Sequence, residues 1–598
     1  MSLNPNFKRI WQYMKPYKFQ FVGAMVATVV MTAASAVEPV VLGLAITELT
    51  ANTIAISKEL PGAGINYDYI GWVCVLYFVR GMFFHCSQYL GQYWLTNVVQ
   101  GAIYDLRNDI SKKVHRLPVA FFDSQQIGDI LSRMTNDVDA ISNALQQSFI
   151  QLVNAVLAIS FAIIMMLFLH WKLALILILS IPVTYWAAKY LLKISQPAFE
   201  KQANALGHLF GFTQEQLSGF TEIKVYGKQE ESIEEFIRRN ASLRDHGFKA
   251  SFLSALMFPS LNLISNFSYI IVALVGAFQV LAGSLSVGNL QAFVQYVWQI
   301  NQPIQMITQL SSILQSAVAA SHRVFDFLDE PEESQAKIRQ ELPKQVRGEV
   351  IFDHVRFGYD PAKPLMKDIS FKVNPGEMVA VVGPTGAGKT TLINLLMRFY
   401  DIDGGSIRID GVDTKLVSRQ NLRRHFGMVL QDAWLYTDTV KENIRFGNLA
   451  AEDYEIKEAA DIANVSHFIK TLPNGYDMEI NEEANNISLG QKQLMTIARA
   501  VIADPDILIL DEATSSVDTR LEQLIQEAMD KVMEGRTSFV IAHRLSTIRN
   551  ADLILVMQEG NITEHGTHEE LLAKGGFYAE LYQSQFNQDT PADIHMSY

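Results

Sequence analysis

The sequence contains little cysteine and little charge. Its 598 residues include two cysteines, Cys74 and Cys86, which excludes a secreted scaffold held together by disulfides. The two lie 12 residues apart, about 18 Å along a helix, so they cannot bond to each other, and we expect both in the hydrophobic core. Charged residues make up 19% of the chain, against about 25% in ordinary soluble domains. This deficit indicates membrane segments.

Basic charge is also scarce. The 49 Lys and Arg are outnumbered by 62 Asp and Glu, and the formal net charge is −13. Binding to nucleic acid phosphates needs a basic face, so nucleic acid is excluded as the main partner. Low-complexity tracts are missing, which excludes a disordered or collagen-like chain.

Long apolar stretches fill the first half of the chain. A membrane-spanning helix needs about 20 mostly apolar residues. Residues 19–37 contain no charged residue, and residues 250–322 contain none over a length sufficient for two spans. The most economical count is six spans, which we place at about 19–47, 69–98, 149–169, 173–192, 251–281 and 287–318.

Lysine and arginine are concentrated in three places: the N-terminus and the connections after the second and fourth spans. Because cytoplasmic segments carry an excess of these residues, the pattern predicts that both termini lie in the cytoplasm. The two long connections are expected to continue the spans as helices, since long unstructured loops are uncommon.

The composition changes after the sixth span. A polar linker is expected at 326–347, following a transmembrane domain at 1–325. Residues 379–382 and 507–510 are apolar runs typical of buried parallel strands. The pattern predicts a polytopic α-helical membrane domain followed by an α/β domain at 348–585 and a C-terminal tail at 586–598.

A glycine-rich motif follows the first of these strands and precedes a helical run. It fits the pattern G-x-x-x-x-G-K-[ST] of phosphate-binding loops. The glycines let backbone N–H groups surround phosphate oxygens, the lysine reaches the β and γ phosphates, and a threonine hydroxyl can bind Mg²⁺. The expected nucleotide-binding residues are Gly383, Pro384, Thr385, Gly386, Ala387, Gly388, Lys389, Thr390 and Thr391.

Two carboxylates, Asp511 and Glu512, end the second apolar run. A carboxylate at a strand end near the phosphate-binding loop can hold the shell of a magnesium ion. Its neighbour can orient or deprotonate the attacking water. The sequence therefore predicts a nucleotide site with Mg²⁺.

An ordered set of motifs surrounds these residues. With them the sequence resembles ATP-binding cassette (ABC) transporters of the exporter type, over nearly the whole chain. The six spans fused ahead of the set resemble one exporter half. The motifs are the phosphate-binding loop, Gln431 in 429–432, a signature segment at 487–491, the pair Asp511 and Glu512, the segment 515–518, and His543 in 542–544.

The resemblance implies a role for each residue of the ATP site. Tyr359 would stack on adenine. Gln431 would contact Mg²⁺ together with Asp511 and sense the membrane half. Glu512 would act as catalytic base, and His543 would contact the γ-phosphate.

The family also implies a second exporter half, because two cassettes stack head to tail around each ATP. Ser488, Gly490 and Gln491 would contact the nucleotide held by the partner. Asp518 would help join the two sites, and Glu479 would contact the transmission helices. Two cytoplasmic segments, 121–133 and 218–224, resemble the loops that dock onto the cassettes.

The signature departs from the usual Leu-Ser-Gly-Gly-Gln. Ile487 and Leu489 stand at the first and third positions, while Glu512 is intact. This combination resembles the catalytically intact chain of a bacterial heterodimeric multidrug exporter, whose partner has a weakened catalytic site. The alternative is a homodimer in which the third position simply varies.

Glutamines recur along the sixth span at steps of three or four, which puts Gln295, Gln299 and Gln302 on one helical face with Trp298. We expect them to line a water-accessible cavity, although hydrogen bonding between helices is the alternative. Glu38 lies within the first span. It could attract cationic compounds, pair with Arg80, or sit near the outer interface and contribute little.

The resemblance implies an ATP-driven pump half in the cytoplasmic membrane of a bacterium, exporting hydrophobic or amphipathic compounds by alternating access. A homodimeric lipid or lipopeptide flippase is the alternative within the same class. A non-transporting ATP-gated regulator or channel subunit would not need an intact Glu512. A soluble P-loop ATPase acting on DNA or in translation conflicts with the apolar spans and the acidic balance.

Overall fold

The chain forms two compact units. The computed structural model describes residues 5–61, 63–333, 340–360, 362–430, 433–481, 486–511, 519–542 and 545–586. The first unit, called here the membrane unit, comprises residues 1–116 and 125–330. The second, the cassette unit, comprises residues 117–124 and 331–598. The predicted domain boundaries at 325 and 348 stay predictions.

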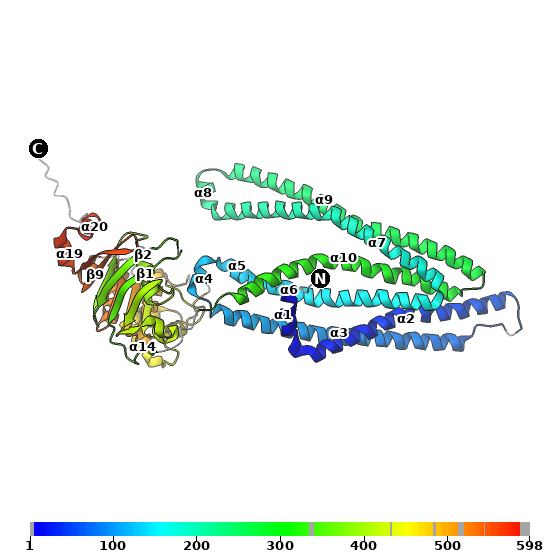
Figure 1. Cartoon of the computed structure of the whole chain (residues 1–598), viewed down its shortest axis with the longest axis horizontal. Helices are drawn as coiled ribbons and strands as arrows, with labels where there is room; N and C mark the ends of the chain where they lie inside the picture. The colour runs from blue at the N-terminus through cyan, green and yellow to red at the C-terminus, as the bar shows by residue number, and fades with distance from the viewer. Residues whose placement is uncertain are drawn as a thin grey trace. The chain divides into compact units, whose positions relative to one another are not determined.

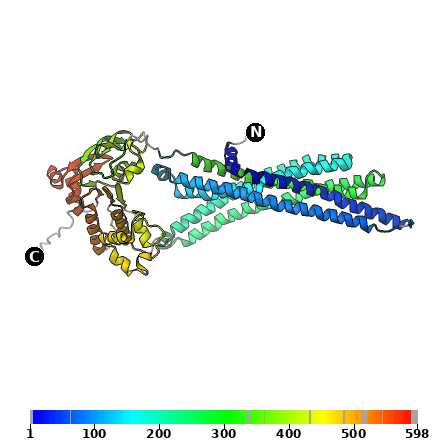
Figure 2. The ribbon, with the colours of Figure 1, turned by 90° about the horizontal axis from the view of Figure 1, so that it is seen from below.

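The membrane unit is a bundle of long helices that run side by side (Figures 1 and 2). Short helical segments precede the long ones at the N-terminus and between α3 and α7. In chain order its elements are α1 (Pro5–Met14), η1 (Lys15–Tyr17), α2 (Lys18–Ser57), α3 (Tyr67–Val114), α5 (Ile127–Ser132), η2 (Arg133–Asp137), α6 (Val138–Asn143), η3 (Ala144–Phe149), α7 (Ile150–Ser218), α8 (Phe220–Val225), α9 (Gln229–Leu281) and α10 (Val287–Asp329).

Four helical stretches of the described chain are long and apolar enough to cross a membrane: 8–57, 67–114, 127–218 and 229–281. The third contains two predicted spans, and α7 breaks between them at His170, whose backbone is extended (φ −164°, ψ 101°). Helix α10 is not among the four, because glutamines spaced along it interrupt its apolar stretches. The count of six spans therefore stays a prediction.

The core of the membrane unit lies where both arms of α7 pack against α9 and α10. Small and branched side chains dominate it, together with the buried rings of Phe293 and Tyr296. Close packing of small residues is the main source of helix association in a membrane, where lipid is as apolar as the protein.

Pro39 interrupts the backbone hydrogen bonds of α2. Pro39 has no N–H, so the carbonyl of Ser35 loses its partner within the helix. Gln299 Nε2 donates to that carbonyl at 3.1 Å, and Tyr296 Oη donates to the next carbonyl, that of Ala36, at 2.6 Å. Helix α10 thus supplies the hydrogen bond that the proline removes from α2.

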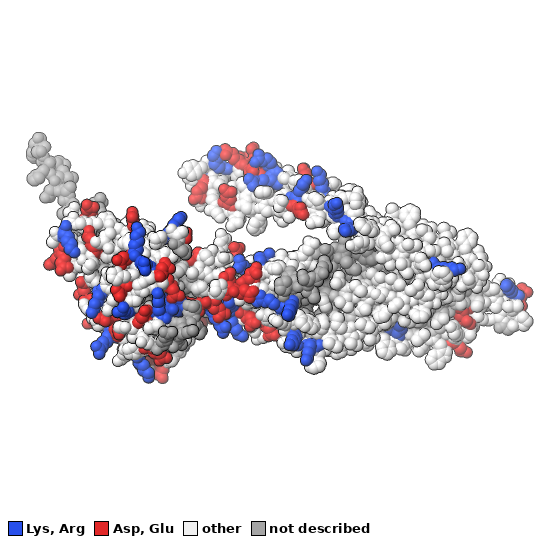
Figure 3. Space-filling model, in the orientation of Figure 1, with Lys and Arg blue, Asp and Glu red and all other residues white. Residues whose placement is uncertain are grey.

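Cys74 and Cys86 are both exposed on α3, so the expectation of core positions is wrong. Both side chains are turned away from the chain's own helices. In a membrane an apolar side chain has no need to be covered by protein, because hydrocarbon serves it equally well. Figure 3 shows the corresponding distribution of charge, sparse along the middle of the membrane unit and dense on the cassette unit.

The cassette unit contains two sheets. An antiparallel sheet has the order β2-β1-β4-β5, and a second sheet, mainly parallel, has the order β10-β9-β3-β8-β7-β6. The strands are β1 (Val350–Phe357), β2 (Met366–Val373), β3 (Met378–Val382), β4 (Gly404–Ile409), β5 (Val412–Asp413), β6 (Phe426–Val429), β7 (Ile507–Asp511), β8 (Thr537–Ile541), β9 (Leu553–Gln558) and β10 (Asn561–Gly566).

Helices cover the second sheet, and both runs that the sequence predicted as buried strands, β3 and β7, form its interior. The helices of the cassette unit are α4 (Val119–Ser124), α11 (Lys389–Leu396), η4 (Thr414–Leu416), α12 (Arg419–Arg423), α13 (Val440–Arg445), α14 (Asp453–Ile462), α15 (Ser466–Thr471), η5 (Gly475–Asp477), α16 (Leu489–Ala503), α17 (Thr519–Met533), α18 (Leu545–Arg549), α19 (His568–Lys574) and α20 (Phe577–Phe586).

The hydrogen bond from Tyr296 to α2 can be tested by removing one oxygen atom. Tyr296→Phe keeps the buried ring and leaves the Ala36 carbonyl without this donor, at a cost of about 1 kcal/mol. We expect the midpoint of thermal unfolding in detergent to fall by a few degrees. Tyr269→Phe is the matched control, since Tyr269 is exposed on α9. Equal midpoints for the two variants would contradict the assignment.

Candidate functional site

The phosphate-binding loop connects β3 to α11. Gly383, Gly386 and Gly388 all have positive φ (154°, 83° and 99°), a region that favours glycine. A Cβ atom on Gly383 would lie 2.3 Å from the carbonyl oxygen of Met557, so no larger residue fits there. The loop therefore keeps its backbone close to the sheet and opens its N–H groups toward an anion at the N-terminus of α11.

Lys389 begins α11 and folds back over the loop. Its Nζ donates to the carbonyls of Gly383 at 2.7 Å and Pro384 at 3.1 Å. Burial lowers the pKa of this amine, and the nearby carboxylate of Asp511 acts in the opposite direction. Pro384, Thr385 and Thr390 are exposed around it, so an incoming phosphate would find the lysine at the centre of an open loop.

Tyr359 lies beside the loop and is 54% exposed. Its hydroxyl is 3.0 Å from the hydroxyl of the buried Thr391 on α11. The edge of the ring is fixed by Phe357 and Tyr400, each with its centroid 5.0 Å away. The ring is therefore held in place and still accessible, as an adenine-stacking residue requires.

Asp511 ends β7 at the same edge of the sheet as the phosphate-binding loop. It pairs with Ile541 of β8, which in turn pairs with Val381 of β3. Gln431, Glu512, Asp518 and His543 lie outside the described residues, so their expected roles stay predictions.

The oxygen donors at this edge suit Mg²⁺. The Thr390 hydroxyl at the start of α11 and the Asp511 carboxylate are hard ligands of the kind this ion prefers, and Mg²⁺ in such sites takes its remaining ligands from phosphate and water. No cluster of three or more His, Cys, Asp or Glu that could hold a metal occurs in the described ranges.

The signature segment starts a helix. Ser488 is the N-cap of α16, and its N–H donates to Gln491 Oε1 at 3.0 Å. Ile487 is buried in the core of the cassette unit, whereas Leu489 is 44% exposed on the first turn. The unusual first position thus serves packing. The unusual third position places a large side chain at a helix N-terminus, next to the N–H groups that would meet a phosphate.

Asn486 ties the signature to the segment before it. Its Nδ2 donates to the carbonyl of Glu479 at 3.1 Å. Glu479 also forms an antiparallel bridge with Thr439, and its side chain is exposed. The predicted coupling residue and the predicted nucleotide contacts are therefore linked through one asparagine.

Sequence reasoning missed Arg499, which organises this region. Its guanidinium donates to the carbonyl of Trp434 at 2.7 Å and to the carbonyl and side chain of Asn443 at 2.5 and 2.6 Å. Burial lowers the pKa of this arginine. It joins α16, which starts at the signature, to the chain that follows Gln431. The detectable signal was a charge among the apolar residues of α16, which needs buried partners.

The beginning of the first predicted docking segment, residues 121–124 of α4, belongs to the cassette unit, whereas residues 125–133 belong to the membrane unit. Tyr400 Oη donates to Asp123 Oδ2 of α4 at 2.5 Å. Burial and this hydrogen bond raise the pKa of the Tyr400 hydroxyl, so it keeps its proton and remains a donor. In the second loop, Phe220, Val225 and Tyr226 are exposed, and their docking stays a prediction.

The membrane unit contains a cavity of about 220 Å³ between α2, α3, α7 and α10. Gln299 and Gln302 are among its lining residues, and their exposure to water and cargo stays a prediction. Gln295 and Trp298, which is 48% exposed, are not part of its lining. None of the lining side chains that the structure describes is charged; the others are Met31, Thr32, Ser35, Ala36, Phe84, Gln88, Asn154, Ala155, Ala158, Pro303 and Met306.

Gln299 combines the two functions that the sequence left as alternatives. It lines the cavity and it bonds to α2 at Ser35. Asn154, across the cavity, accepts a hydrogen bond from Thr32 at 2.7 Å. The polar lining is therefore fixed by contacts between helices.

Glu38 is paired. Its carboxylate lies 2.9 Å from Arg80 and accepts a hydrogen bond from Tyr77 at 2.8 Å. The arginine also lies over the ring of Tyr77, with its central carbon 4.9 Å from the centroid. Of the alternatives, pairing with Arg80 is what the structure contains, and attraction of cationic compounds stays a prediction.

The substitution Arg499→Lys keeps the positive charge at this position and removes the guanidinium hydrogen bonds. The compact ammonium group of lysine cannot reach all of the acceptors on Trp434 and Asn443 that the planar guanidinium binds at once. We expect ATP turnover to fall roughly tenfold, with ATP affinity nearly unchanged because the phosphate-binding loop is untouched. Steady-state turnover and nucleotide titration measure the two effects. Lys457→Arg, exposed on α14, is the control. A parallel loss of affinity and turnover would contradict the role.

Comparison with known proteins gives the same arrangement of domains. The family model of the ABC transporter transmembrane region matches residues 21–304, and the ABC transporter model matches residues 366–515. A solved bacterial Atm1-family ABC exporter with ATP bound has a TM-score of 0.77 and 28% identity, covering 96% of this chain and 99% of that one.

Curated relatives match over most of their length. A fatty acid ABC transporter ATP-binding/permease protein of Mycobacterium tuberculosis is 46% identical over 87% of this chain and 82% of its own. An ATP-dependent lipid A-core flippase of Syntrophus aciditrophicus is 34% identical over 98% of this chain and 95% of its own. A putative multidrug export ATP-binding/permease protein of Staphylococcus aureus is 34% identical over 97% of this chain and 99% of its own. The chain therefore belongs to the ABC transporter family, as an exporter half-transporter that dimerises and couples ATP hydrolysis to transport across a membrane.

Proposed function

We propose that this chain exports hydrophobic or amphipathic compounds through the cavity between α2, α3, α7 and α10. The observation that carries the proposal is the uncharged lining, which combines amides with methionine and phenylalanine side chains. Apolar walls with a few placed polar groups are typical of sites for small amphipathic ligands. A transporter for ions or highly charged metabolites would need compensating charge inside the membrane.

The lipid alternative has its own support. One relative is named for fatty acids and another for a lipid A-core, alongside the multidrug exporter. These names describe the relatives, and all three cargoes are amphipathic. We therefore propose the broader class for this chain, with both termini in the cytoplasm of a bacterium, and keep lipid translocation as the second candidate.

At the ATP site we propose that Lys389 and the loop amides hold the phosphates while Tyr359 stacks on the base. Thr390, Gln431 and Asp511 would hold Mg²⁺, which supplies charge neutralisation on the phosphates. Glu512 would orient and deprotonate the attacking water, and His543 would contact the γ-phosphate. Ser488, Gly490 and Gln491 would close the partner's nucleotide, with Asp518 and Glu479 linking the sites and the loops.

We propose that the partner is a different chain with a weakened catalytic site. Leu489 stands on the first turn of α16 with much of its side chain exposed. There it would crowd a phosphate held by the opposite cassette. Glu512 would then work in the site that the partner's unaltered signature closes.

ATP turnover by the purified chain in lipid tests this assignment. If a partner is required, the folded chain alone should hydrolyse Mg-ATP at a very low rate, and Leu489→Gly should raise that rate because the phosphate gains access to the helix N-terminus. Glu512→Gln on either background should be inactive. Robust turnover by the unmodified chain, abolished by Glu512→Gln, would instead establish a competent homodimer.

Thiol labelling tests the cavity. In a background with Cys74 and Cys86 replaced by serine, cysteines at positions 299 and 302 should react with aqueous thiol reagents and be protected by a bound amphipathic compound. A cysteine at the buried position 300 is the control. If 299 and 302 stay unreactive while a cysteine at the exposed position 281 reacts, the cavity is not on the transport path.

A further inference from the structure

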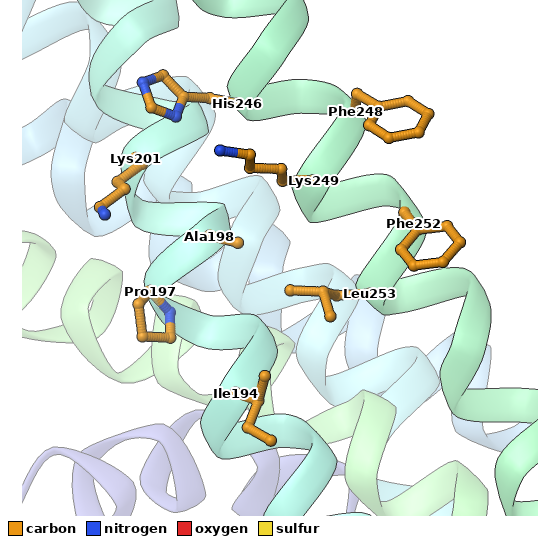
Figure 4. A pocket seen from close by; sticks show the side chains of 9 residues that line it. All are labelled: Ile194, Pro197, Ala198, Lys201, His246, Phe248, Lys249, Phe252 and Leu253. Atoms are coloured by element: carbon orange, nitrogen blue, oxygen red, sulfur yellow. The ribbon is translucent and has the colours of Figure 1, made fainter.

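A second pocket lies between α7 and α9, apart from the cavity described above. Its volume is about 380 Å³, within the range of small-molecule sites. Figure 4 shows side chains from both helices around it, with Lys201, His246 and Lys249 toward one end and Ile194 and Leu253 toward the other. The pocket is thus basic at one end and apolar at the other.

The basic end coincides with the end of the apolar stretch on α9. Lys249 is the last charged residue of that helix, because residues 250–281 contain no Asp, Glu, Lys or Arg. Across the gap, Lys201 comes one turn after Pro197 of α7. The end of an apolar stretch marks the surface of the bilayer. Basic groups at that position lie among lipid headgroups, and the apolar groups of the same pocket lie where acyl chains begin.

Neighbouring carboxylates have other partners. Glu200 accepts a hydrogen bond from Gln196 at 3.4 Å, and Asp245 pairs with Arg244 at 2.8 Å. Over the described ranges, neither Lys201 nor Lys249 is joined to a carboxylate. The two lysines are therefore available to an anion from outside the chain.

We propose that this pocket binds an anionic phospholipid of the surrounding bilayer. Its phosphate would lie among Lys201, His246 and Lys249, and an acyl chain would run over Ile194, Leu253 and Phe252. Basic pockets between membrane helices favour anionic headgroups in this way. The site is independent of the cargo proposed above, because it shares no lining residue with the cavity and needs no transport.

Two alternatives to lipid binding lead to different outcomes. Lysines near a membrane surface can simply extend to water, in which case any interfacial lysine pair would hold lipid equally weakly. Alternatively, helices of the second exporter half could fill the pocket in the dimer, in which case no lipid would be retained there.

Native mass spectrometry of the full-length dimer, released from detergent with defined lipids, tests the proposal. We expect retained phosphatidylglycerol to exceed phosphatidylcholine, and Lys201→Gln with Lys249→Gln to weaken phosphatidylglycerol binding about tenfold. The matched control is Lys189→Gln with Lys193→Gln, two exposed lysines on α7 outside the pocket. Unchanged thermal midpoint and ATP turnover would show that the variants are folded.

Three outcomes would overturn the proposal: equal retention of the two lipids, an equal loss in the control variant, or retention by the monomer but not by the dimer. If the double lysine variant does not fold, Phe252→Asp offers a second test, because it places a negative charge over the proposed acyl path and should also reduce phosphatidylglycerol retention. Lipid counting does not depend on cargo, so failure here leaves the proposed export function untouched.

Discussion

The membrane unit depends on one constraint: in hydrocarbon, every backbone polar group needs a partner within the protein. Long helices satisfy almost all of these groups, and Pro39 is the place where α2 cannot. Gln299 and Tyr296 of α10 supply donors at the carbonyls of Ser35 and Ala36. Ser35, Ala36 and Gln299 also line the cavity, so the residues that compensate for the proline also shape the space that cargo would enter.

In the cassette unit, a glycine and an arginine determine where backbone polar groups lie. Gly383 lets the phosphate-binding loop lie against the carbonyl of Met557, which leaves the loop amides for a ligand. Arg499 brings a charge into the interior and engages several acceptors at once. Both arrangements fix backbone positions in advance, and such preorganisation is what stabilises developing charge in a reaction.

The sequence was sufficient for the features that depend on contiguous residues. The fold class, the phosphate-binding loop between a strand and a helix, and the buried strands β3 and β7 follow from local pattern, because these elements are specified by neighbours in the chain. The pairing of Glu38 with Arg80 was foreseen as one of several possibilities.

Features that depend on distant segments were not predictable. Tyr296 and Ala36 are 260 residues apart, and nothing in either segment alone identifies the other. The cysteines were misplaced because a rule for soluble cores does not hold where lipid replaces protein as the apolar surroundings. Trp298 shares a helical face with the glutamines, yet a shared face does not determine which cavity each side chain reaches.

The short segment 117–124 groups with the cassette unit although helices of the membrane unit flank it on both sides in the chain. The functional module is therefore discontinuous in sequence. A chimaera that joins the membrane half of one exporter to the cassette of another at the linker would separate Asp123 from Tyr400, its hydrogen-bond partner. Exchange of cassettes by recombination must carry this eight-residue insert as well, which limits the crossover points available during the evolution of such transporters.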